Sequence, residues 1–572
     1  MPADNAEIAE LFNRYADLLE IEDANPFRVR AYRNAARVVA GYSRAMTELV
    51  AEGRDLDDLP GIGKELAKKI AVMVQTGKLP QLEQLQKRIP GSLSELMRLP
   101  GLGPKRVKLL FRELKIRNFE DLKRAARSGT LSTLPGFGAK IIARVLASLE
   151  THNTGPQRFK LADAEQIATP LLVYLRKIPG VKRVEIAGSY RRRCDTVGDL
   201  DIVVTGARDV PVMARFVKYD AVAEVLSEGS TRATVKLRNG IQVDLRLMPT
   251  ISYGAALYYF TGSKAHNIAV RKIAVAKGLK INEYGVYRGP KRIAGRTETE
   301  LLAAVGLPYI PPELREARGE IEAARTGKLP NLINLTDIKG DLHAHTDATD
   351  GHDTLAAMAK AAQARGYDYL AISNHSRHLT VAHGLNAKQL LTEIHAIDKL
   401  NSKLRNFHVL KGTEVDILED GSLDLPDSIL KELDVVVAAV HYQLELPAAK
   451  QTTRILKAFD NRHIHILAHP TTRLINTRAE TNADMDKIYR SAAAAGVALE
   501  INANPERLDL DDIHARAAHR TGCKLVISSD AHSTRGLADM RFGVDQARRA
   551  WLEPGDVLNT LPRDKLLQAL AR

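Results

Sequence analysis

Residues 198–204 read GDLDIVV and residues 241–249 read IQVDLRLMP, and these two segments decide the fold of the central part of the chain. In both, aliphatic residues alternate with acidic or polar ones, which is typical of a half-buried β-strand. Asp199 and Asp201 are two positions apart, so their carboxylates share one face of the strand. Asp244 lies on the polar face of the other strand. The three carboxylates can therefore meet, and they predict a site for two Mg²⁺ ions.

Such a site suits in-line phosphoryl transfer, in which the ions activate a hydroxyl and neutralise a leaving pyrophosphate. Upstream, Gly188 and Ser189 precede the run Tyr-Arg-Arg-Arg, which includes Arg192. Small residues at a helix start can hold a triphosphate while an arginine binds it with two hydrogen bonds. A lone DxD is more often a solvated turn and an arginine run is usually surface. The ordered spacing of all these elements favours a nucleotidyltransferase palm of mixed helices and strands.

A short pattern recurs three times in the N-terminal part, as LPGIGKELAKKI, LPGLGPKRVKLL and LPGFGAKIIARVL, starting at Leu59, Leu99 and Leu134. Its Gly-hydrophobic-Gly turn lets the backbone approach a phosphate, and the next helix offers unpaired N–H groups. One copy could equally be a tight turn between packed helices. Three copies in a helical, basic segment predict helix-hairpin-helix motifs that bind DNA without regard to its sequence. The residues assigned to this role are Gly61, Gly63, Lys64, Gly101, Gly103, Lys105, Gly136, Gly138 and Lys140.

The charge of the chain is divided unevenly. Residues 1–338 hold 54 Lys and Arg against 38 Asp and Glu, a difference of +16, whereas residues 339–572 hold 29 against 31, a difference of −2. The excess favours a polyanion partner for the N-terminal part, although a basic surface alone cannot identify it.

From Lys339 onward, strands such as YLAIS, VVVAAVH, IHILAHP and KLVISSD alternate with alanine-rich helices, which indicates a barrel-like parallel sheet. The segments DLHAHTDATDG, SNHS, GTEVD, AAVHY, LAHP and SSDAH each end such a strand. A barrel gathers strand ends around one mouth. One buried histidine is usually structural, but this set without thiolates favours up to three Zn²⁺, Mn²⁺ or Fe²⁺ ions. The predicted ligands are His343, His345, Asp350, His375, Glu414, His441, His469, Asp530 and His532.

Several classes of protein are excluded by the same sequence. The two cysteines, Cys194 and Cys523, are far apart and support neither a disulfide framework nor a thiolate zinc site. Aliphatic runs such as residues 435–440 are too short for a membrane span. The start, MPADNAEIAE, lacks the features of a secretion signal, so we expect a cytoplasmic protein. We also expect a monomer.

The motifs GSYRRR, GDLDIVV, VDLRLM, YYFTGSKAHN and INEYGVY occur in the order found in family X DNA polymerases, the group of DNA polymerase beta, and residues 1–315 resemble that family. The resemblance implies gap-filling synthesis on gapped or nicked DNA with a recessed 3′ primer, using dNTPs. It makes Asp199, Asp201 and Asp244 the catalytic metal ligands, with Asp244 nearest the primer. It assigns nucleotide binding to Gly188, Ser189, Arg192, Tyr259, Phe260, Gly262, Lys264 and Asn267, among which Tyr259 could otherwise be core and Lys264 replaces an acidic residue of polymerase beta.

The same resemblance aligns Lys69 with the lysine that forms a Schiff base with a deoxyribose phosphate in polymerase beta. Phe27 replaces a histidine of that pocket, while Arg28 and Tyr32 keep compatible chemistry. Lys69 also belongs to a basic helix of the first hairpin motif. A lyase nucleophile and an ordinary phosphate contact are both consistent with its position.

The C-terminal motifs are similar to the PHP (polymerase and histidinol phosphatase) domain, whose ligand set they match, with Asn374 at a position often held by Asp. The two modules together resemble the bacterial PolX enzymes. This implies Mn²⁺-favoured 3′→5′ exonuclease activity and leaves AP-endonuclease activity open. The alternatives are a structural or pyrophosphate-clearing accessory domain, a non-catalytic DNA-end scaffold that would lack the palm carboxylates, and an RNA nucleotidyltransferase that would lack the hairpin motifs.

The expected fold is therefore multidomain, with helical N-terminal domains, an α+β palm and thumb, and a C-terminal α/β distorted barrel. The expected boundaries are 1–90 for a DNA-end-binding domain, 91–150 for a fingers-like domain, 151–248 for the palm, 249–315 for the thumb, 316–338 for a linker and 339–572 for the PHP domain.

Overall fold

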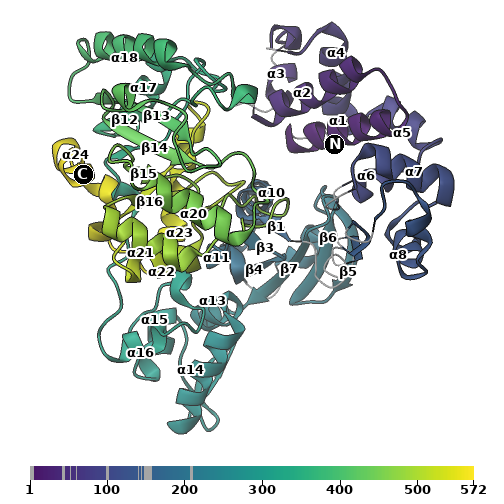
Figure 1. The fold of residues 1–572 in the computed structure, drawn as a ribbon. Coiled ribbons are helices and arrows are strands. Elements are labelled where there is room, and N and C mark those ends of the chain that lie inside the picture. The colour runs from purple at the N-terminus through teal and green to yellow at the C-terminus, as the bar shows by residue number, and fades with distance from the viewer. Residues whose placement is uncertain are drawn as a thin grey trace. The chain divides into compact units, whose positions relative to one another are not determined.

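The computed structural model (Figure 1) describes the chain except for residues 1–4, 42–45, 52, 60, 98, 100–101, 139–140, 144, 147–157, 207–209 and 572. Its contacts divide the chain into two compact units, residues 1–156 and residues 157–572.

The N-terminal unit is helical throughout its described part. Apolar side chains at helical spacing, including Ile8, Phe12 and Leu19, form the buried stripe of its first helix. One continuous core runs from Ile8 to Val145, so the two helical domains expected on either side of residue 90 pack together. The expected boundary at residue 150 lies outside the described residues. The helices are α1 (Asn5–Ile21), α2 (Pro26–Gly41), α3 (Met46–Ala51), α4 (Lys64–Thr76), α5 (Pro80–Gln86), α6 (Leu93–Leu96), α7 (Pro104–Leu114) and α8 (Phe119–Arg127), with 3₁₀ turns at Leu56–Asp58 and Thr130–Thr133.

The second unit begins with the palm, a mixed five-stranded sheet in the order β2-β4-β7-β6-β5. The strands that carry the predicted carboxylates, β4 and β7, are parallel neighbours at its centre. Their aliphatic residues, including Leu200, Val243 and Leu245, are fully buried, as the alternation predicts. The palm elements are β1 (Phe159–Lys160), α10 (Leu161–Arg176), β2 (Val181–Ile186), α11 (Gly188–Arg191), β3 (Thr196–Val197), β4 (Asp199–Gly206), α12 (Val212–Phe216), β5 (Val222–Glu228), β6 (Arg232–Leu237) and β7 (Gln242–Met248).

The thumb follows as helices around a small antiparallel sheet in the order β10-β9-β8. Residues 316–338, expected as a linker, contain the helix α16 (Glu320–Arg325), and Ala324 and Leu332 are buried in the thumb core. The segment is thus a packed part of the fold, because its apolar residues have a neighbouring core to join. The thumb elements are α13 (Tyr253–Thr261), α14 (Lys264–Ala276), β8 (Lys280–Asn282), β9 (Gly285–Arg288), β10 (Lys291–Ala294) and α15 (Glu298–Ala304).

The C-terminal region is a seven-stranded parallel sheet in sequential order from β11 to β17. A parallel bridge between Ala344 and Ala531 joins its two ends, so the sheet is a nearly closed barrel. The strands are β11 (Gly340–Asp341), β12 (Tyr369–Ile372), β13 (His408–Asp416), β14 (Val435–Ala439), β15 (Ile466–Leu467), β16 (Ala498–Asn502) and β17 (Leu525–Ser528). The helices are α17 (Leu355–Ala364), α18 (Ala387–Asn401), α19 (Asp427–Leu430), α20 (Ala448–Ala458), α21 (Met485–Ala495), α22 (Asp512–Arg520), α23 (Met540–Arg549) and α24 (Arg563–Leu570).

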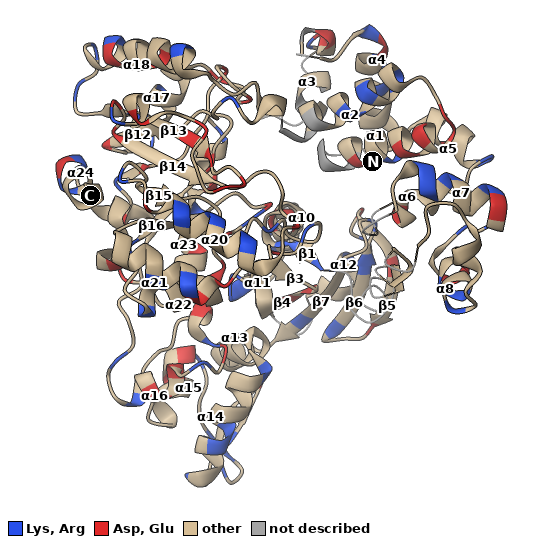
Figure 2. Cartoon of the chain, viewed as in Figure 1, with Lys and Arg blue, Asp and Glu red and all other residues tan. Residues whose placement is uncertain are grey.

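The barrel packs against the palm through both apolar and charged contacts. Ile475, Leu508 and Phe542 of the barrel are buried in the palm core. Arg193 of the palm pairs with Asp545 of α23 at 2.6 Å. Figure 2 marks the Lys and Arg positions of the ribbon in blue and the Asp and Glu positions in red, and both colours occur in the palm and in the barrel. Removing the barrel would therefore expose palm core.

Candidate active sites and nucleic-acid interface

The palm carboxylates are brought together by strand register. In the parallel pairing of β4 with β7, Asp201 lies directly opposite Asp244, and Asp199 is two residues before Asp201 on β4. Because side chains alternate across a strand, all three carboxylates lie on the same face of the sheet. The predicted triad is therefore assembled by the β4–β7 pair.

The charges of this group oppose one another. Burial, together with the negative charges of Asp199 and Asp244, raises the pKa of Asp201 to about 7. Burial and Asp244 also raise the pKa of Asp199. A cation among these carboxylates would favour their charged forms.

Asp244 differs because three side chains donate hydrogen bonds to it. Thr234 Oγ1 and Gln242 Nε2 each donate at 2.7 Å, and Arg232 Nη2 donates at 3.1 Å. Burial would raise the pKa of Asp244, but these donors lower it below its ordinary value. Of the three aspartates, Asp244 is therefore the one whose ionised form is held most strongly. No motif in the sequence indicates this difference.

The residues that are predicted to bind the triphosphate lie next to these three carboxylates. Gly188 has a φ of +63°, and a Cβ built on it would lie 3.0 Å from Asp201 Oδ2, so only glycine fits there without strain. Ser189 follows it in α11. Arg192 donates through Nη1 to the Thr261 carbonyl at 2.6 Å and through Nε to Glu316 at 2.9 Å. The arginine is thus oriented by the thumb and by the segment after it.

The remaining predicted nucleotide-binding residues lie at the α13–α14 turn. The rings of Tyr259 and Phe260 meet edge to face with centroids 5.0 Å apart. Asn267 Nδ2 donates to the Tyr259 carbonyl at 2.8 Å. Gly262 has a φ of +68° between the helices, and Lys264 is exposed at the start of α14.

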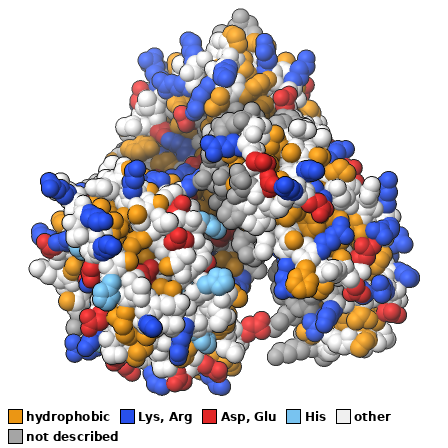
Figure 3. Space-filling model, turned by 90° about the horizontal axis from the view of Figure 1, so that it is seen from above, with side chains coloured by type: hydrophobic (Ala, Val, Ile, Leu, Met, Phe, Trp, Pro, Cys, Tyr) orange, Lys and Arg blue, Asp and Glu red, His pale blue; other side chains and the backbone are white. Residues whose placement is uncertain are grey.

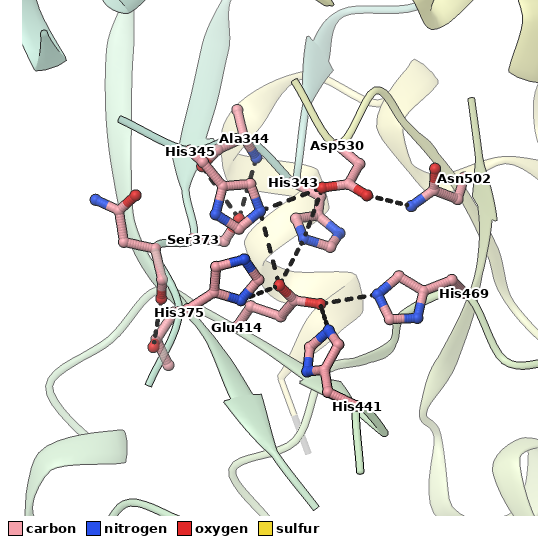
Figure 4. Close-up of polar contacts among 12 residues, drawn as sticks. His343, Ala344, His345, Ser373, His375, Glu414, His441, His469, Asn502 and Asp530 are labelled. Atoms are coloured by element: carbon pink, nitrogen blue, oxygen red, sulfur yellow. Dashed lines mark hydrogen bonds and ion pairs between the residues drawn. The ribbon is translucent and has the colours of Figure 1, made fainter. Parts of the chain in front are cut away.

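The C-terminal residues converge on one centre at the barrel mouth (Figure 4). The imidazoles of His343, His375 and His469 surround the Glu414 carboxylate, which is 2.7 Å from His375 Nδ1 and 2.9 Å from His469 Nε2. Eight predicted ligands form three groups whose ligand atoms lie within 4.8 Å of one another: His345, Asp350, His375 and His532; His343, His345 and Asp530; and His375, Glu414 and His441. His469 joins them through Glu414.

The donor atoms of this centre fit divalent metal ions. In the part of the chain that the structure describes, His343 Nε2, both ring nitrogens of His345 and His469 Nδ1 are buried without a hydrogen-bond partner. Buried polar atoms are normally satisfied, so their convergence favours ligation. Among the described residues, all three close groups lie in the barrel, and the palm carboxylates form none.

Electrostatics in the barrel site show how strongly its groups interact. Burial opposes the charge on Glu414, but His375, His441 and His343 lower its pKa well below the ordinary value. Burial likewise disfavours protonation of His375, but Glu414 and Asp350 raise the pKa of that imidazole to about 10. Glu414 and the imidazole of His375 thus favour one another's charged forms.

Three residues outside the predicted set orient the ligands. Glu500 Oε1 is 2.7 Å from His343 Nδ1, Asp416 Oδ1 is 2.8 Å from His441 Nδ1, and Asn502 Nδ2 donates to Asp530 Oδ2 at 3.2 Å. Carboxylates behind ligating histidines fix the ring orientation and increase basicity. The signal that could have indicated Glu500 is an acidic residue between the aliphatic residues Leu499 and Ile501 of the buried strand β16.

Asn374, at the position often held by Asp in PHP domains, makes four buried hydrogen bonds beside His375. Its side-chain oxygen accepts from Thr346 N at 2.8 Å and Thr349 Oγ1 at 2.9 Å, and its amide donates to Thr346 and to Glu393. It thereby holds the loop after His345 in place.

In the N-terminal unit, the hairpin motifs have the local geometry of phosphate-binding turns. Gly61 and Gly136 have φ values of +77° and +85°, which favour glycine. Gly63 and Gly103 are the N-caps of α4 and α7, so backbone N–H groups are unpaired beyond them. Of the other residues assigned to this role, Lys64 and Lys105 are exposed, Gly138 is exposed, and Gly101 and Lys140 lie outside the described residues.

On the face shown in Figure 3, the described Lys and Arg side chains are spread among acidic and apolar ones and form no continuous patch.

Lys69 is buried in α4, with 7% of its surface exposed. Its ammonium pairs with Glu65 and lies 5.5 Å from the Tyr32 ring centroid. Burial lowers the pKa of Lys69, but the hydrogen bond to Glu65 and the contact with Tyr32 raise it above the ordinary value overall. Phe27 is 74% exposed, so its ring is not packed into the core of this unit.

Comparisons with known proteins find matches to the helical N-terminal unit, to the palm and thumb, and to the C-terminal barrel. Family models described as "Helix-hairpin-helix domain", "SAM-like Helix-hairpin-helix tandem" and "DNA polymerase beta thumb" match residues 3–79, 93–151 and 256–316. The DNA polymerase/3′-5′ exonuclease PolX of Bacillus subtilis (strain 168) is 38% identical over 557 residues, which is 97% of each chain.

Two further relatives cover parts of the chain. A probable phosphatase of Thermoanaerobacter sp. (strain X514) is 28% identical over 38% of this chain and 89% of its own. DNA polymerase lambda of Arabidopsis thaliana is 26% identical over 54% of this chain and 62% of its own. None of the helices described by the structure is long and apolar enough to cross a membrane.

Proposed function

Because the chain belongs to the PolX family of family X DNA polymerases with a PHP-domain 3′→5′ exonuclease, we propose that its two sites, the carboxylates of the palm and the histidine-rich centre of the barrel, divide these reactions between them. The palm extends a primer across a gap, and the barrel removes nucleotides from a 3′ end. The observation that carries the palm assignment is the register that places Asp201 opposite Asp244. The convergence of unpaired ligand atoms carries the barrel assignment.

In the palm, we propose that Asp199, Asp201 and Asp244 are the catalytic carboxylates that act on a primer terminus and an incoming dNTP. Divalent ions, when bound, supply the positive charge that activates the primer hydroxyl and neutralises the pyrophosphate. Asp244, held as a carboxylate by its hydrogen-bond donors, is the group nearest the primer. Ser189 and Arg192 bind the triphosphate.

The residues of the α13–α14 turn complete the nucleotide site. The ring pair of Tyr259 and Phe260 packs against the sugar and excludes a 2′-hydroxyl, while Gly262 allows the turn between the helices. Lys264 adds positive charge near the triphosphate. Asn267 braces the Tyr259 carbonyl at 2.8 Å and is the candidate minor-groove contact.

In the barrel, the nine predicted ligands would hold up to three ions. Such ions would supply positive charge to a phosphodiester and would lower the pKa of a nearby water. Glu500 and Asp416 orient His343 and His441 for this purpose. We assign Mg²⁺ to the all-carboxylate palm, and Mn²⁺ or Zn²⁺ to the imidazole-rich barrel, because these ions differ in ligand preference. AP-endonuclease activity would use the same barrel site.

A gapped-DNA assay with dNTPs and one metal at a time tests this division. Mg²⁺ is expected to support primer extension with little degradation, whereas Mn²⁺ is expected to support release of nucleotides from a single-stranded 3′ end. Extension and degradation that respond identically to both ions would contradict the metal assignment.

We further propose that the chain acts as a monomer on gapped or nicked DNA, which its hairpin turns hold by the phosphate backbone. Replacing Lys64 and Lys105 by Glu is expected to weaken binding to gapped DNA of any sequence and to reduce the slope of log K against log salt by roughly one to two. The measurement is a fluorescence titration at several salt concentrations.

The matched control is the double variant Lys87→Glu with Arg117→Glu, which makes the same change in charge outside the hairpin motifs. An equal change of slope in this control would show that overall charge, rather than the hairpin turns, determines binding.

For Lys69, we propose a phosphate contact near the 5′ end of a gap in preference to a lyase nucleophile. An amine acts as a nucleophile only when neutral, and the pairing with Glu65 favours the charged form. Borohydride is expected to trap little or no adduct with a 5′-deoxyribose phosphate end. A strong adduct that disappears in the Lys69→Ala variant and persists in Lys68→Ala would establish lyase activity instead.

A further inference from the structure

Arg192, the palm arginine that we propose binds the triphosphate, is part of a hydrogen-bond network that extends into the barrel. Arg192 Nε donates to Glu316 Oε1 at 2.9 Å, and its Nη1 donates to the Thr261 carbonyl at 2.6 Å. These two bonds fix the plane of the guanidinium. Glu316 belongs to the packed segment after the thumb, at a position to which no motif assigned a role.

The same carboxylate oxygen is shared with a second arginine. Arg549, the last residue of α23 in the barrel, donates through Nη1 to Glu316 Oε1 at 3.1 Å and to the Arg192 carbonyl at 2.8 Å. Its side chain is only 5% exposed, and Glu316 is 16% exposed. Arg549 therefore contacts both the backbone of Arg192 and the counter-ion of its side chain.

Arg549 is itself anchored within the barrel. Its Nη2 donates to Asp512 Oδ2 at 2.9 Å, and Asp512 also accepts from Arg318 at 2.6 Å. Asp512 begins α22, so two barrel helices fix the position of this arginine. A rigid, buried arginine of this kind is suited to positioning a neighbour.

We propose that Arg549 of the PHP domain is a positioning residue for the polymerase reaction, which orients Arg192 and offsets the charge of Glu316 so that Arg192 stays available to a nucleotide triphosphate. The proposal rests on the proposed role of Arg192 in dNTP binding. Without Arg549, Arg192 would be the one cation left paired with Glu316 among the described residues. The guanidinium would then be drawn toward Glu316 and partly neutralised.

The test is steady-state gap filling by the full-length enzyme with varied dNTP. Arg549→Ala is expected to raise the KM for dNTP by about tenfold, the effect of losing one charge-assisted hydrogen bond, with kcat changed by less than about twofold. Arg549→Lys keeps a positive charge but cannot make all three bonds, so a smaller increase is expected. Exonuclease activity on a single strand reports that each variant is folded.

Arg548→Ala is the matched control, because Arg548 lies on the same helix and pairs with Glu313 across the same interface without contacting Arg192 or Glu316. Its KM for dNTP is expected to stay unchanged. An equal increase in this control would mean that loosening of the interface, not Arg549, raises the KM, and would overturn the proposal.

Two other variants separate this proposal from its premise. If Arg192→Ala leaves the KM for dNTP unchanged, the proposed role of Arg192 is wrong. If Arg192→Ala raises the KM but Arg549→Lys does not, the positioning role is wrong. Should Arg549→Ala lose both activities, Arg549→Lys decides the outcome.

Discussion

Replacement of Asp244 by alanine is expected to lower the rate of nucleotide incorporation by roughly 10⁴-fold, an effect typical of removing a central catalytic group. The change removes the carboxylate opposite Asp201 in the β4–β7 register and the group we place nearest the primer hydroxyl. Binding to gapped DNA should be nearly intact, because the hairpin motifs lie in the other compact unit. The measurement is single-nucleotide incorporation in Mg²⁺, with DNA binding followed in parallel.

Alanine also leaves the Thr234 hydroxyl without its partner, so Asp244→Asn serves as the isosteric variant and should lose activity to a similar extent. Asp220→Asn is the control, since Asp220 is an exposed residue of the same palm. Normal incorporation by both Asp244 variants would show that the palm assignment is wrong.

The double variant His343→Ala with His345→Ala is expected to lose 3′→5′ degradation by at least about 10³-fold while it keeps primer extension. The two imidazoles contribute to two of the three close groups of ligand atoms, so their loss dismantles the barrel site. The palm carboxylates belong to a different sheet and keep their own neighbours. Degradation of a single-stranded oligonucleotide in Mn²⁺ is the measurement, together with the Mn²⁺ content of the purified protein.

His395→Ala provides the control, because His395 is exposed on α18 and belongs to no group of ligand atoms. Full degradation by the double variant would place the trimming reaction elsewhere in the chain. Loss of extension together with degradation would show that the barrel variant disturbs the palm through their shared packing.

That packing explains why point variants, rather than truncation, separate the two reactions. The segment 316–338 was expected to be a linker, but it is packed into the thumb core, and Phe542 of the barrel lies in the palm core. A chain that ends before residue 339 would expose these apolar contacts and lose the partner of Glu316. It would thus test stability as much as function.

The sequence by itself predicted the fold class of the helical, palm and barrel regions, and it indicated the residues that we propose for the two sites. Alternation around Asp199, Asp201 and Asp244 is a local property of strands, and it suffices to place carboxylates on one face. Histidines and carboxylates at the ends of successive strands likewise predict one site, because parallel strands in a barrel end at one mouth. These inferences need only the period of secondary structure.

Only the tertiary structure decided which groups act on those side chains. Glu500 behind His343, the donors to Asp244, and Arg549 beside Glu316 come from segments distant in sequence, and their pairing depends on how helices and strands pack. Local periodicity carries no information about such contacts, because a buried charge is stabilised by whichever partner the fold brings to it. For the same reason, residues 316–338 resemble a linker in isolation and become part of the core only when the thumb offers a surface to cover.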